Sequence, residues 1–272
     1  MNFLKGCTRE ARFIERFEMP SSSIQLPLKD KLGIVTGANR GIGLAIIRKL
    51  ASQGCNLITL TREIDEGFIE ETKNLSSNFG ITVDMQKFDL TNNDTIVQLI
   101  KHLTTQKLKI DILINNAGAP SGSLIHMTGA SNLRKIFEAN FFGPFLLTQS
   151  VSKLMVRTGG GSIVNISSVT AYRAQSGMVA YGSSKSAFSY ACEVLAIELA
   201  DKKVRVNTIA PGLIDTEMLN SMEEKAKSNM LSRVPMGRFG EASEVADLVS
   251  YLVGNESSYI SGSIIHVDGS MR

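Results

Sequence analysis

The sequence predicts an α/β fold, in which one doubly wound parallel sheet carries helices on both of its faces. Short apolar, β-branched runs alternate with segments of helical periodicity along most of the 272 residues. Such alternation is typical of right-handed βαβ units around a parallel sheet. A glycine-rich turn, GANRGIG at residues 37–43, lies between the first such run and a helical segment. Because ligands of these sheets bind beyond the carboxyl ends of the strands, we expect the functional site there.

The expected strands share short length and β-branched or apolar character, and each is followed by a turn or a helical pattern. They are residues 32–36, 56–61, 81–88, 110–115, 162–168 and 204–210, with a last one near 263–267. After the glycine turn, LAIIRKLASQG has apolar residues at helical spacing and ends at Gly54. We see no internal repeat beyond two βαβ halves and no low-complexity tract. Residues 29–272 are therefore expected to form one domain.

Composition excludes several classes of function. The hydrophobic content of 43% and charged content of 20% fit a globular protein. The net charge of +3 is scattered, with no basic run, which argues against a nucleic-acid partner. No stretch approaches 18 apolar residues, so no membrane span is expected. The three histidines have no spacing typical of metal ligands, so we predict no metal site.

Residues 1–28 are expected to be a poorly defined N-terminal extension to the domain. Acidic residues within it speak against a mitochondrial transit peptide, and no apolar segment suggests secretion. A targeting segment and an over-called start codon are the alternative interpretations. The three cysteines lie far apart without a CxxC motif, which indicates a reducing compartment. We therefore expect a cytoplasmic protein.

The glycine turn predicts a site for a phosphate group. Gly37, Gly41 and Gly43 let the backbone approach a ligand, and the first N–H groups of the following helix would face an anion. The spacing is GxxxGxG, whereas GxGxxG is the commoner dinucleotide pattern. A glycine-rich turn without a ligand is the alternative.

A tyrosine and a lysine predict proton transfer. Tyr181 and Lys185 belong to YGSSK and lie four residues apart, on one face of a helix. An ammonium beside a phenol favours the phenolate and lowers the phenol pKa from its usual ~10. A tyrosine in that state exchanges a proton near neutral pH. The pattern indicates chemistry at a carbonyl or alcohol oxygen.

Together, these motifs resemble the short-chain dehydrogenase/reductase family over residues 29–272. The resemblance rests on TGANRGIG, NNAG at 115–118, Asn140, Ser168, Tyr181, Lys185 and PG at 211–212. MGRFGEASEVADLVSYL and the tail YISGSIIHVDGSMR are most similar to the 3-oxoacyl-[acyl-carrier-protein] reductase branch. The resemblance implies a Rossmann-like fold and hydride transfer between a nicotinamide and a carbonyl carbon.

The resemblance also implies four catalytic roles. Tyr181 would give the proton, and Ser168 would hold the substrate oxygen. Lys185 would bind the nicotinamide ribose and lower the Tyr181 pKa. Asn140 would anchor a water that links Lys185 to solvent, the alternative being a helix kink or a local backbone bond. Ser167 competes with Ser168, but the separation of 13 residues from Tyr181 favours Ser168.

The resemblance implies a cofactor-binding set that starts at the glycine turn and follows successive strand ends. Its members are Gly37, Asn39, Arg40, Gly41, Ile42, Gly43, Arg62, Asp89, Leu90, Asn116, Ala117, Gly118, Tyr181, Lys185, Pro211, Gly212, Ile214 and Thr216.

The cofactor is expected to be NADPH, with NADH as the alternative. Thr61 stands where NAD-preferring relatives place an aspartate, and Arg62 follows it. Arg62 and Arg40 suit a 2′-phosphate. Asp89 would accept from the adenine amine, and the Ile214 N–H would bind the carboxamide.

The function predicted on this basis is NADPH-dependent reduction of a 3-oxoacyl thioester. One alternative is an oxidoreductase of another small carbonyl or alcohol, such as a sugar, polyol, steroid or quinone. Another is a non-catalytic nucleotide-binding scaffold, because fold does not fix function. The substrate pocket is expected between 119–127, 169–178 and a lid over 213–236.

Two kinds of partner are expected. The points matching an acyl-carrier-protein docking site hold Gly159, with Arg157 nearby, and Lys202, so the match is partial. Apolar residues of the segments 131–157 and 180–200 exceed what one sheet face would bury. With the resemblance, they indicate a homotetramer.

Overall fold

Seven parallel strands form the central sheet of the computed structural model, which describes residues 26–216 and 224–271. Their order across the sheet is β3-β2-β1-β4-β5-β6-β9. The strands are β1 (Leu32–Thr36), β2 (Asn56–Thr61), β3 (Val83–Lys87), β4 (Ile112–Asn115), β5 (Gly161–Ile166), β6 (Val204–Pro211) and β9 (Ile264–Val267). Strand β1 pairs with β2 on one side and β4 on the other, so the strand order reverses there. The predicted fold class is confirmed.

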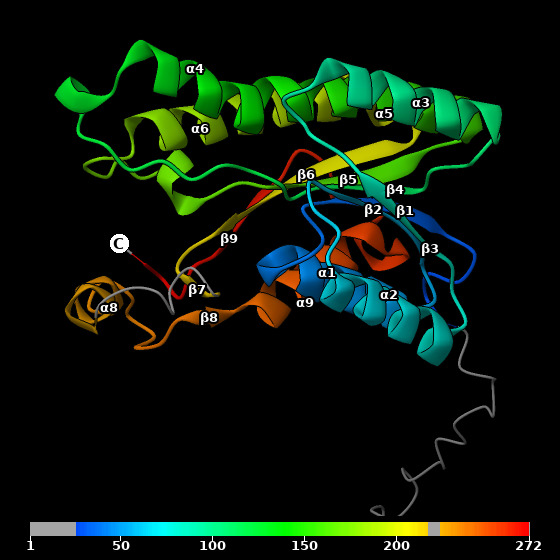
Figure 1. The fold of residues 1–272 in the computed structure, drawn as a ribbon, viewed down its shortest axis with the longest axis horizontal. Helices are drawn as coiled ribbons and strands as arrows, with labels where there is room; N and C mark the ends of the chain where they lie inside the picture. Colours follow the sequence, from blue (N-terminus) through cyan, green and yellow to red (C-terminus); the bar gives the residue numbers. More distant parts are fainter. Residues whose placement is uncertain (1–25, 217–223, 272) are drawn as a thin grey trace, which may run out of the picture.

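Helices cover both faces of this sheet. The covering helices are α1 (Gly41–Ser52), α2 (Glu66–Phe79), α3 (Asn93–Thr105), α4 (Ala130–Phe137), α5 (Gly143–Thr158), α6 (Val179–Leu199) and α9 (Ala242–Val253), and α8 (Glu224–Leu231) lies beyond the end of the sheet (Figure 1). Helices α1, α2 and α9 lie on one face and α3 to α6 on the other (Figure 1). A two-stranded pair, β7 (Ile214–Asp215) with β8 (Gly240–Glu241), lies near α8 beside the end of the main sheet (Figure 1).

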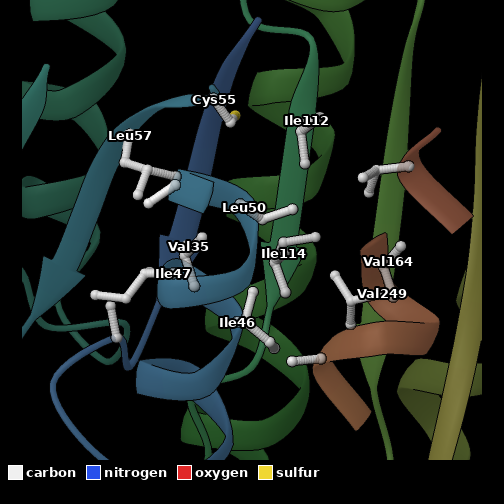
Figure 2. Packing of buried hydrophobic residues seen from close by; sticks show 14 of the residues in the cluster. Val35, Ile46, Ile47, Leu50, Cys55, Leu57, Ile112, Ile114, Val164 and Val249 are labelled. Carbon is white, nitrogen blue, oxygen red and sulfur yellow. The ribbon is translucent and has the colours of Figure 1, made fainter. Parts of the chain in front are cut away.

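Alternating side chains of the central strands fill two hydrophobic clusters. Val35 and Ile114 pack with Ile46 of α1 and Val249 of α9 (Figure 2). Ile34, the neighbour of Val35, belongs to the cluster on the opposite face. Each fully buried side chain of this size contributes about 1.5–3 kcal/mol. Because both faces are covered, the strands are continuous apolar runs rather than alternating ones.

Helix starts differ in a way that matters for the site. The Asp65 carboxylate caps α2 by accepting from Phe68 N at 2.8 Å, and Glu241 with Glu244 forms a capping box on α9. Helix α1 has no side-chain cap, because Arg40 precedes it with extended backbone and makes no capping bond. The first N–H groups of α1 therefore remain available to an external acceptor.

The described chain begins within the segment that the sequence assigns to the extension. Leu28 is 3% exposed and belongs to the cluster on the α1 face. Its N–H donates to Gln53 O at 3.0 Å, and Leu26 contacts Gly54. These residues cover the end of α1.

Across residues 26–216 and 224–271, no helix has the length and apolar character needed to span a bilayer.

Candidate functional site

A cleft of about 760 Å³ lies at the carboxyl ends of β1, β2 and β4, where the strand order reverses. Most of the predicted cofactor-binding residues line it. They are Gly37, Asn39, Arg40, Gly41, Ile42, Gly43, Arg62, Asp89, Leu90, Asn116, Ala117, Gly118 and Thr216. The structure therefore gathers residues from five separate parts of the chain into one site.

The glycine turn needs its glycines for two different reasons. Gly37 and Gly41 have φ angles of 64° and 52°, in the left-handed region that side chains rarely adopt. A Cβ at Gly43 would collide with the Gly37 carbonyl oxygen and stand 2.6 Å from Asn116 Nδ2. Gly43 thus lets α1 approach β1 closely, with its uncapped N-terminus at the cleft.

The Thr36 side chain holds this turn in place, a role that the sequence analysis did not predict. Its Oγ1 accepts from the N–H groups of Asn116 at 3.0 Å and Ala117 at 2.9 Å. Asn116 Nδ2 donates in return to the carbonyls of Thr36 and Gly37, both at 3.0 Å. The Asn116 side chain is therefore used to join β1 to β4. A hydroxyl residue directly before the first glycine is the signal that could have indicated this.

The adenosine end of the cleft has unused polar groups. Thr61 is 2% exposed, and its Oγ1 has no hydrogen-bond partner. Within the described residues, the exposed side chains of Arg40 and Arg62 form no ion pair. Asp89 Oδ1 accepts from the N–H and hydroxyl of Thr91, at 2.9 and 2.8 Å, and its second oxygen is free to bind a ligand. A buried unpaired hydroxyl, free guanidiniums and an uncapped helix start fit a phosphate-bearing dinucleotide.

Five residues of the predicted cofactor set are not part of the cleft lining: Tyr181 and Lys185 of the catalytic group, and Pro211, Gly212 and Ile214. The Gly212 N–H donates to Val267 O at 2.9 Å, and Gly212 packs on Asp268. Pro211 ends β6, and Ile214 is 8% exposed in the α1-face cluster.

The four predicted catalytic residues come from three segments. Ser168 follows β5, Tyr181 and Lys185 lie on α6, and Asn140 lies in a π-helical turn between α4 and α5. A Cβ at Gly118 would stand 3.2 Å from Lys185 Nζ and 3.1 Å from Asn140 Oδ1. Gly118 therefore joins the dinucleotide cleft to the catalytic group.

Asn140 locks the segment after β4 onto α6. Its Oδ1 accepts from Ala119 N at 2.7 Å, and its Nδ2 donates to Ala119 O and Ser184 Oγ, both at 3.0 Å. Ser184 Oγ donates to Tyr181 O at 2.8 Å. The π-turn at Glu138–Phe142 shifts the helix register where Asn140 is buried, as such turns often do at functional sites.

The electrostatics of Tyr181 differ from the sequence-based expectation. Burial raises the pKa of Tyr181, and hydrogen bonding to Ser168 opposes this only in part. Lys185 Nζ donates instead to Ile166 O at 2.8 Å, and burial lowers the Lys185 pKa to about 8, with Cys192 opposing the change. In this arrangement the Lys185 ammonium is bound to the strand end and is not among the groups that shift the Tyr181 pKa, so its effect on the phenol stays a prediction.

Two adjacent serines have different surroundings. Ser168 Oγ accepts from Thr170 N at 3.2 Å and from Thr170 Oγ1 at 2.9 Å, and it is the hydroxyl that reaches Tyr181. Ser167 is buried and bonds Ser189 Oγ at 2.7 Å. The geometry favours Ser168 as the serine of the site.

A second cavity, of about 730 Å³, lies beside the start of α6. Its walls are residues 124–126 and 170–179, together with Gly182 and its neighbours on α6. The two loops meet where Ser123 N donates to Gly177 O at 2.8 Å. These walls match the predicted segments 119–127 and 169–178. The predicted lid over 213–236 falls partly on residues 217–223, outside the described residues.

The C-terminal segment is built into the wall of the site. Arg173 in the loop after Ser168 pairs with Asp268, with Nη1 and Oδ2 at 2.7 Å. Val169, Val234 and Met271 form a small buried cluster. The end of the chain therefore connects the Ser168 loop to the segment that follows α8.

The candidate carrier-docking residues lie away from this chain's own site. Arg157 and Gly159 precede β5, and Lys202 precedes β6, so they lie at the amino ends of the strands. Strand β5 spans Gly161–Ile166, roughly 20 Å of extended chain, between them and Ser168.

Comparisons with known proteins agree on the family. The profile of a family described as Enoyl-(Acyl carrier protein) reductase matches residues 37–271. The chain is 34% identical over 246 residues to 3-oxoacyl-[acyl-carrier-protein] reductase FabG of Thermotoga maritima, covering 90% of this chain and 98% of that protein.

Solved structures give the same result. A 7α-hydroxysteroid dehydrogenase complexed with NADH and 7-oxo glycochenodeoxycholic acid is 30% identical, with a TM-score of 0.82 over 91% of this chain and 96% of that chain. L-sorbose reductase from Gluconobacter frateurii, complexed with NADPH and L-sorbose, is 26% identical, with a TM-score of 0.83 over 91% and 98%. With a cleft that meets Lys185 and Asn140 at Gly118, the chain belongs to the short-chain dehydrogenase/reductase family and is an NAD(P)-dependent oxidoreductase of CH–OH and C=O groups.

Proposed function

We propose that this protein uses NADPH to reduce a 3-oxoacyl thioester to the 3-hydroxyacyl thioester. The observation that carries the proposal is the convergence of Lys185 and Asn140 on Gly118, where the dinucleotide cleft meets the catalytic group. The name of the T. maritima relative supports the thioester substrate.

The chemistry follows from the states of the side chains. Bound reduced nicotinamide would supply the hydride. Because burial raises its pKa, the Tyr181 phenol is protonated at neutral pH and can give its proton to the carbonyl oxygen. The Ser168 hydroxyl would donate to the same oxygen as negative charge develops on it. Lys185 would hold the ribose hydroxyls and lower the Tyr181 pKa, and an Asn140-anchored water would return the proton.

The preference for NADPH rests on the adenosine end of the cleft. Arg40 and Arg62 are cations without described ion-pair partners. Thr61 ends β2 and lines the cleft, and its hydroxyl has no hydrogen-bond partner. Guanidiniums bind a dianionic 2′-phosphate with paired, charge-assisted hydrogen bonds. An uncharged threonine at this position also removes the repulsion that an aspartate would impose.

The role of Tyr181 is tested by Tyr181→Phe. Removing a general acid should lower kcat by roughly 10²–10⁴-fold, while calorimetry should show dinucleotide binding within about twofold of the wild type. A variant that reduces carbonyls at the normal rate would show that Tyr181 is not the acid.

The substrate class is tested by kcat/KM for acetoacetyl thioesters against a panel of free sugars, steroids and quinones. A thioester preference of about a hundredfold, equivalent to ~2.7 kcal/mol, would support the proposal. A comparable preference for a free carbonyl would favour the second candidate, for which the steroid and sorbose enzymes among the solved relatives provide the precedent.

We also propose a homotetramer and docking of an acidic carrier protein. Tyr190 and Ile197 lie seven residues apart on α6 and are 71% and 80% exposed, and Phe142 is 47% exposed. Exposed apolar groups on one helix face are typical of an interface between copies. In such an assembly, Arg157 and Lys202 of one copy could serve the site of another.

A further inference from the structure

Two buried serine hydroxyls connect β5 to α6. Ser167 is 4% exposed and Ser189 1% exposed, and their Oγ atoms are 2.7 Å apart. Ser189 Oγ also donates to Lys185 O at 2.8 Å. Each hydroxyl has one proton, and a carbonyl only accepts. The Ser189 proton is therefore committed to Lys185 O, and Ser167 is the donor in the pair.

This pair lies between the two halves of the catalytic group. Ser167 directly precedes Ser168, and Ser189 is one helical turn beyond Lys185. The Ser167 N–H also donates to Ile209 O at 2.8 Å, which anchors it to β6. The pair thus links the strand end that carries Ser168 to the helix that carries Tyr181 and Lys185.

A second connection between the same elements is the bond from Lys185 Nζ to Ile166 O, at 2.8 Å. In the proposed function, Lys185 Nζ shares its three protons between Ile166 O and the ribose hydroxyls. The Ser167–Ser189 bond involves no group of the proposed chemistry. It would therefore hold β5 and α6 in register whatever Lys185 binds during turnover.

We propose that Ser167 and Ser189 are positioning residues that hold the Ser168 hydroxyl against the Tyr181 phenol. The inference rests on the proposed function for its catalytic consequence. Its geometric content, the distance between Ser168 and Tyr181, is independent of the substrate.

Several titratable groups surround the pair and have to be considered in its test. Tyr172, after β5, lies close to both hydroxyls, and its ring packs edge-on against His266 of β9 with centroids 5.3 Å apart. On α6, Glu193 and Cys192 lie near Tyr172, and Cys192 lies near Lys185.

The test compares Ser167→Ala, Ser189→Ala and the double variant. The chain has five tyrosines, so ¹³C-tyrosine labelling with Tyr181→Phe for assignment gives a resolvable Tyr181 signal. Hydrogen bonding to Ser168 lowers the Tyr181 pKa, so its loss should raise the titration midpoint by about half a pH unit or more. We expect kcat to fall roughly tenfold, with the double variant no worse than either single one.

Two controls separate positioning from general destabilisation. Ser152→Ala removes another buried hydroxyl, which bonds Gln149 O on α5 at 3.1 Å, and should leave both readouts unchanged. Ser189→Thr keeps the hydroxyl and should restore the Tyr181 midpoint. If the alanine variants fail to fold, Ser189→Cys, which keeps a small side chain but replaces the hydroxyl by a weak thiol donor, should raise the Tyr181 midpoint in the same direction.

An unchanged Tyr181 midpoint in the alanine variants, or kcat losses that simply add, would overturn the inference. Failure of the proposed function looks different. In that case the wild type would lack turnover or dinucleotide binding, while the tyrosine titration, recorded without ligand, would still respond to the serine substitutions.

Discussion

Lys185 is a cation enclosed by protein, and this has a cost that depends on pH. Burial lowers its pKa to about 8 from 10.5. The unfolded chain therefore binds more protons than the folded one between these pH values. Below pH 8 the folded state carries the full penalty of a buried charge, and the penalty disappears as pH rises towards 10.5.

Lys185→Met should therefore change the pH dependence of stability. We expect the variant to gain on the wild type by about 1–3 kcal/mol at pH 7, because an apolar chain replaces a buried ammonium. Its advantage should shrink between pH 8 and 10.5, which denaturant unfolding at each pH would measure. Lys101→Met, at an exposed position on α3, is the control and should show no such trend. A constant difference across pH would contradict the buried-charge argument.

Arg62→Ala tests cofactor recognition at a single residue. Loss of a bidentate contact to the 2′-phosphate should weaken NADPH binding roughly 10- to 100-fold and leave NADH binding within about twofold. Calorimetry with both dinucleotides measures this. Arg134→Ala, on the exposed side of α4, should alter neither. Equal weakening for both dinucleotides would indicate that Arg62 does not read the phosphate.

At the scale of the element, the carboxyl end of α9 depends on a residue from β6. Arg205 donates to the carbonyls of Leu252 at 2.7 Å, Gly254 at 3.1 Å and Ile260 at 3.1 Å. A cation there also interacts favourably with the negative end of the helix dipole. Partial burial of the Arg205 guanidinium lowers its pKa. The three hydrogen bonds to carbonyl oxygens offset the free-energy cost of that burial.

Arg205→Leu should destabilise the fold by about 2 kcal/mol, because three carbonyls lose a charged donor. Hydrogen exchange should accelerate in the last turn of α9 before other helices. Arg157→Leu provides the matched comparison, since Arg157 is an exposed arginine in the last turn of α5. Uniform acceleration over the whole chain would argue against a local role.

The elements themselves were largely predictable from sequence. Strand β1 has its predicted bounds, Leu32–Thr36. A strand that is buried on both faces is a continuous apolar run, and such a run can be located in the sequence. The π-turn at Glu138–Phe142 could not be predicted, because it accompanies a contact between Asn140 and Ala119 that forms only in the folded chain. The same holds for Lys185 and Ile166, whose contact depends on how α6 packs on β5.

At the scale of the whole molecule, the α3–α6 layer has an inner face that the sheet covers and an outer face that still carries apolar groups. Tyr190 and Ile197 lie on that outer face of α6. The sequence indicated an excess of apolar residues there. It could not divide these residues between core and surface: Phe188, two residues before Tyr190, is 1% exposed, whereas Tyr190 is 71% exposed.

Ile197→Lys together with Tyr190→Asp should convert the proposed tetramer to a smaller species. Charged side chains on the proposed contact face would be desolvated without partners. Sedimentation velocity measures the change, and Val97→Lys, an equally apolar and exposed residue on α3, is the control. A wild type that sediments as a monomer would remove the basis for the tetramer.

The cluster of Val169, Val234 and Met271 has a consequence for substitutions far from the chemistry. Met271 is 4% exposed, and Asp268 is held by Arg173. A polar side chain in place of Met271 would lose this apolar environment and disturb the loop that carries Ser168. Damage at the far end of the sequence would then be seen first as slower chemistry.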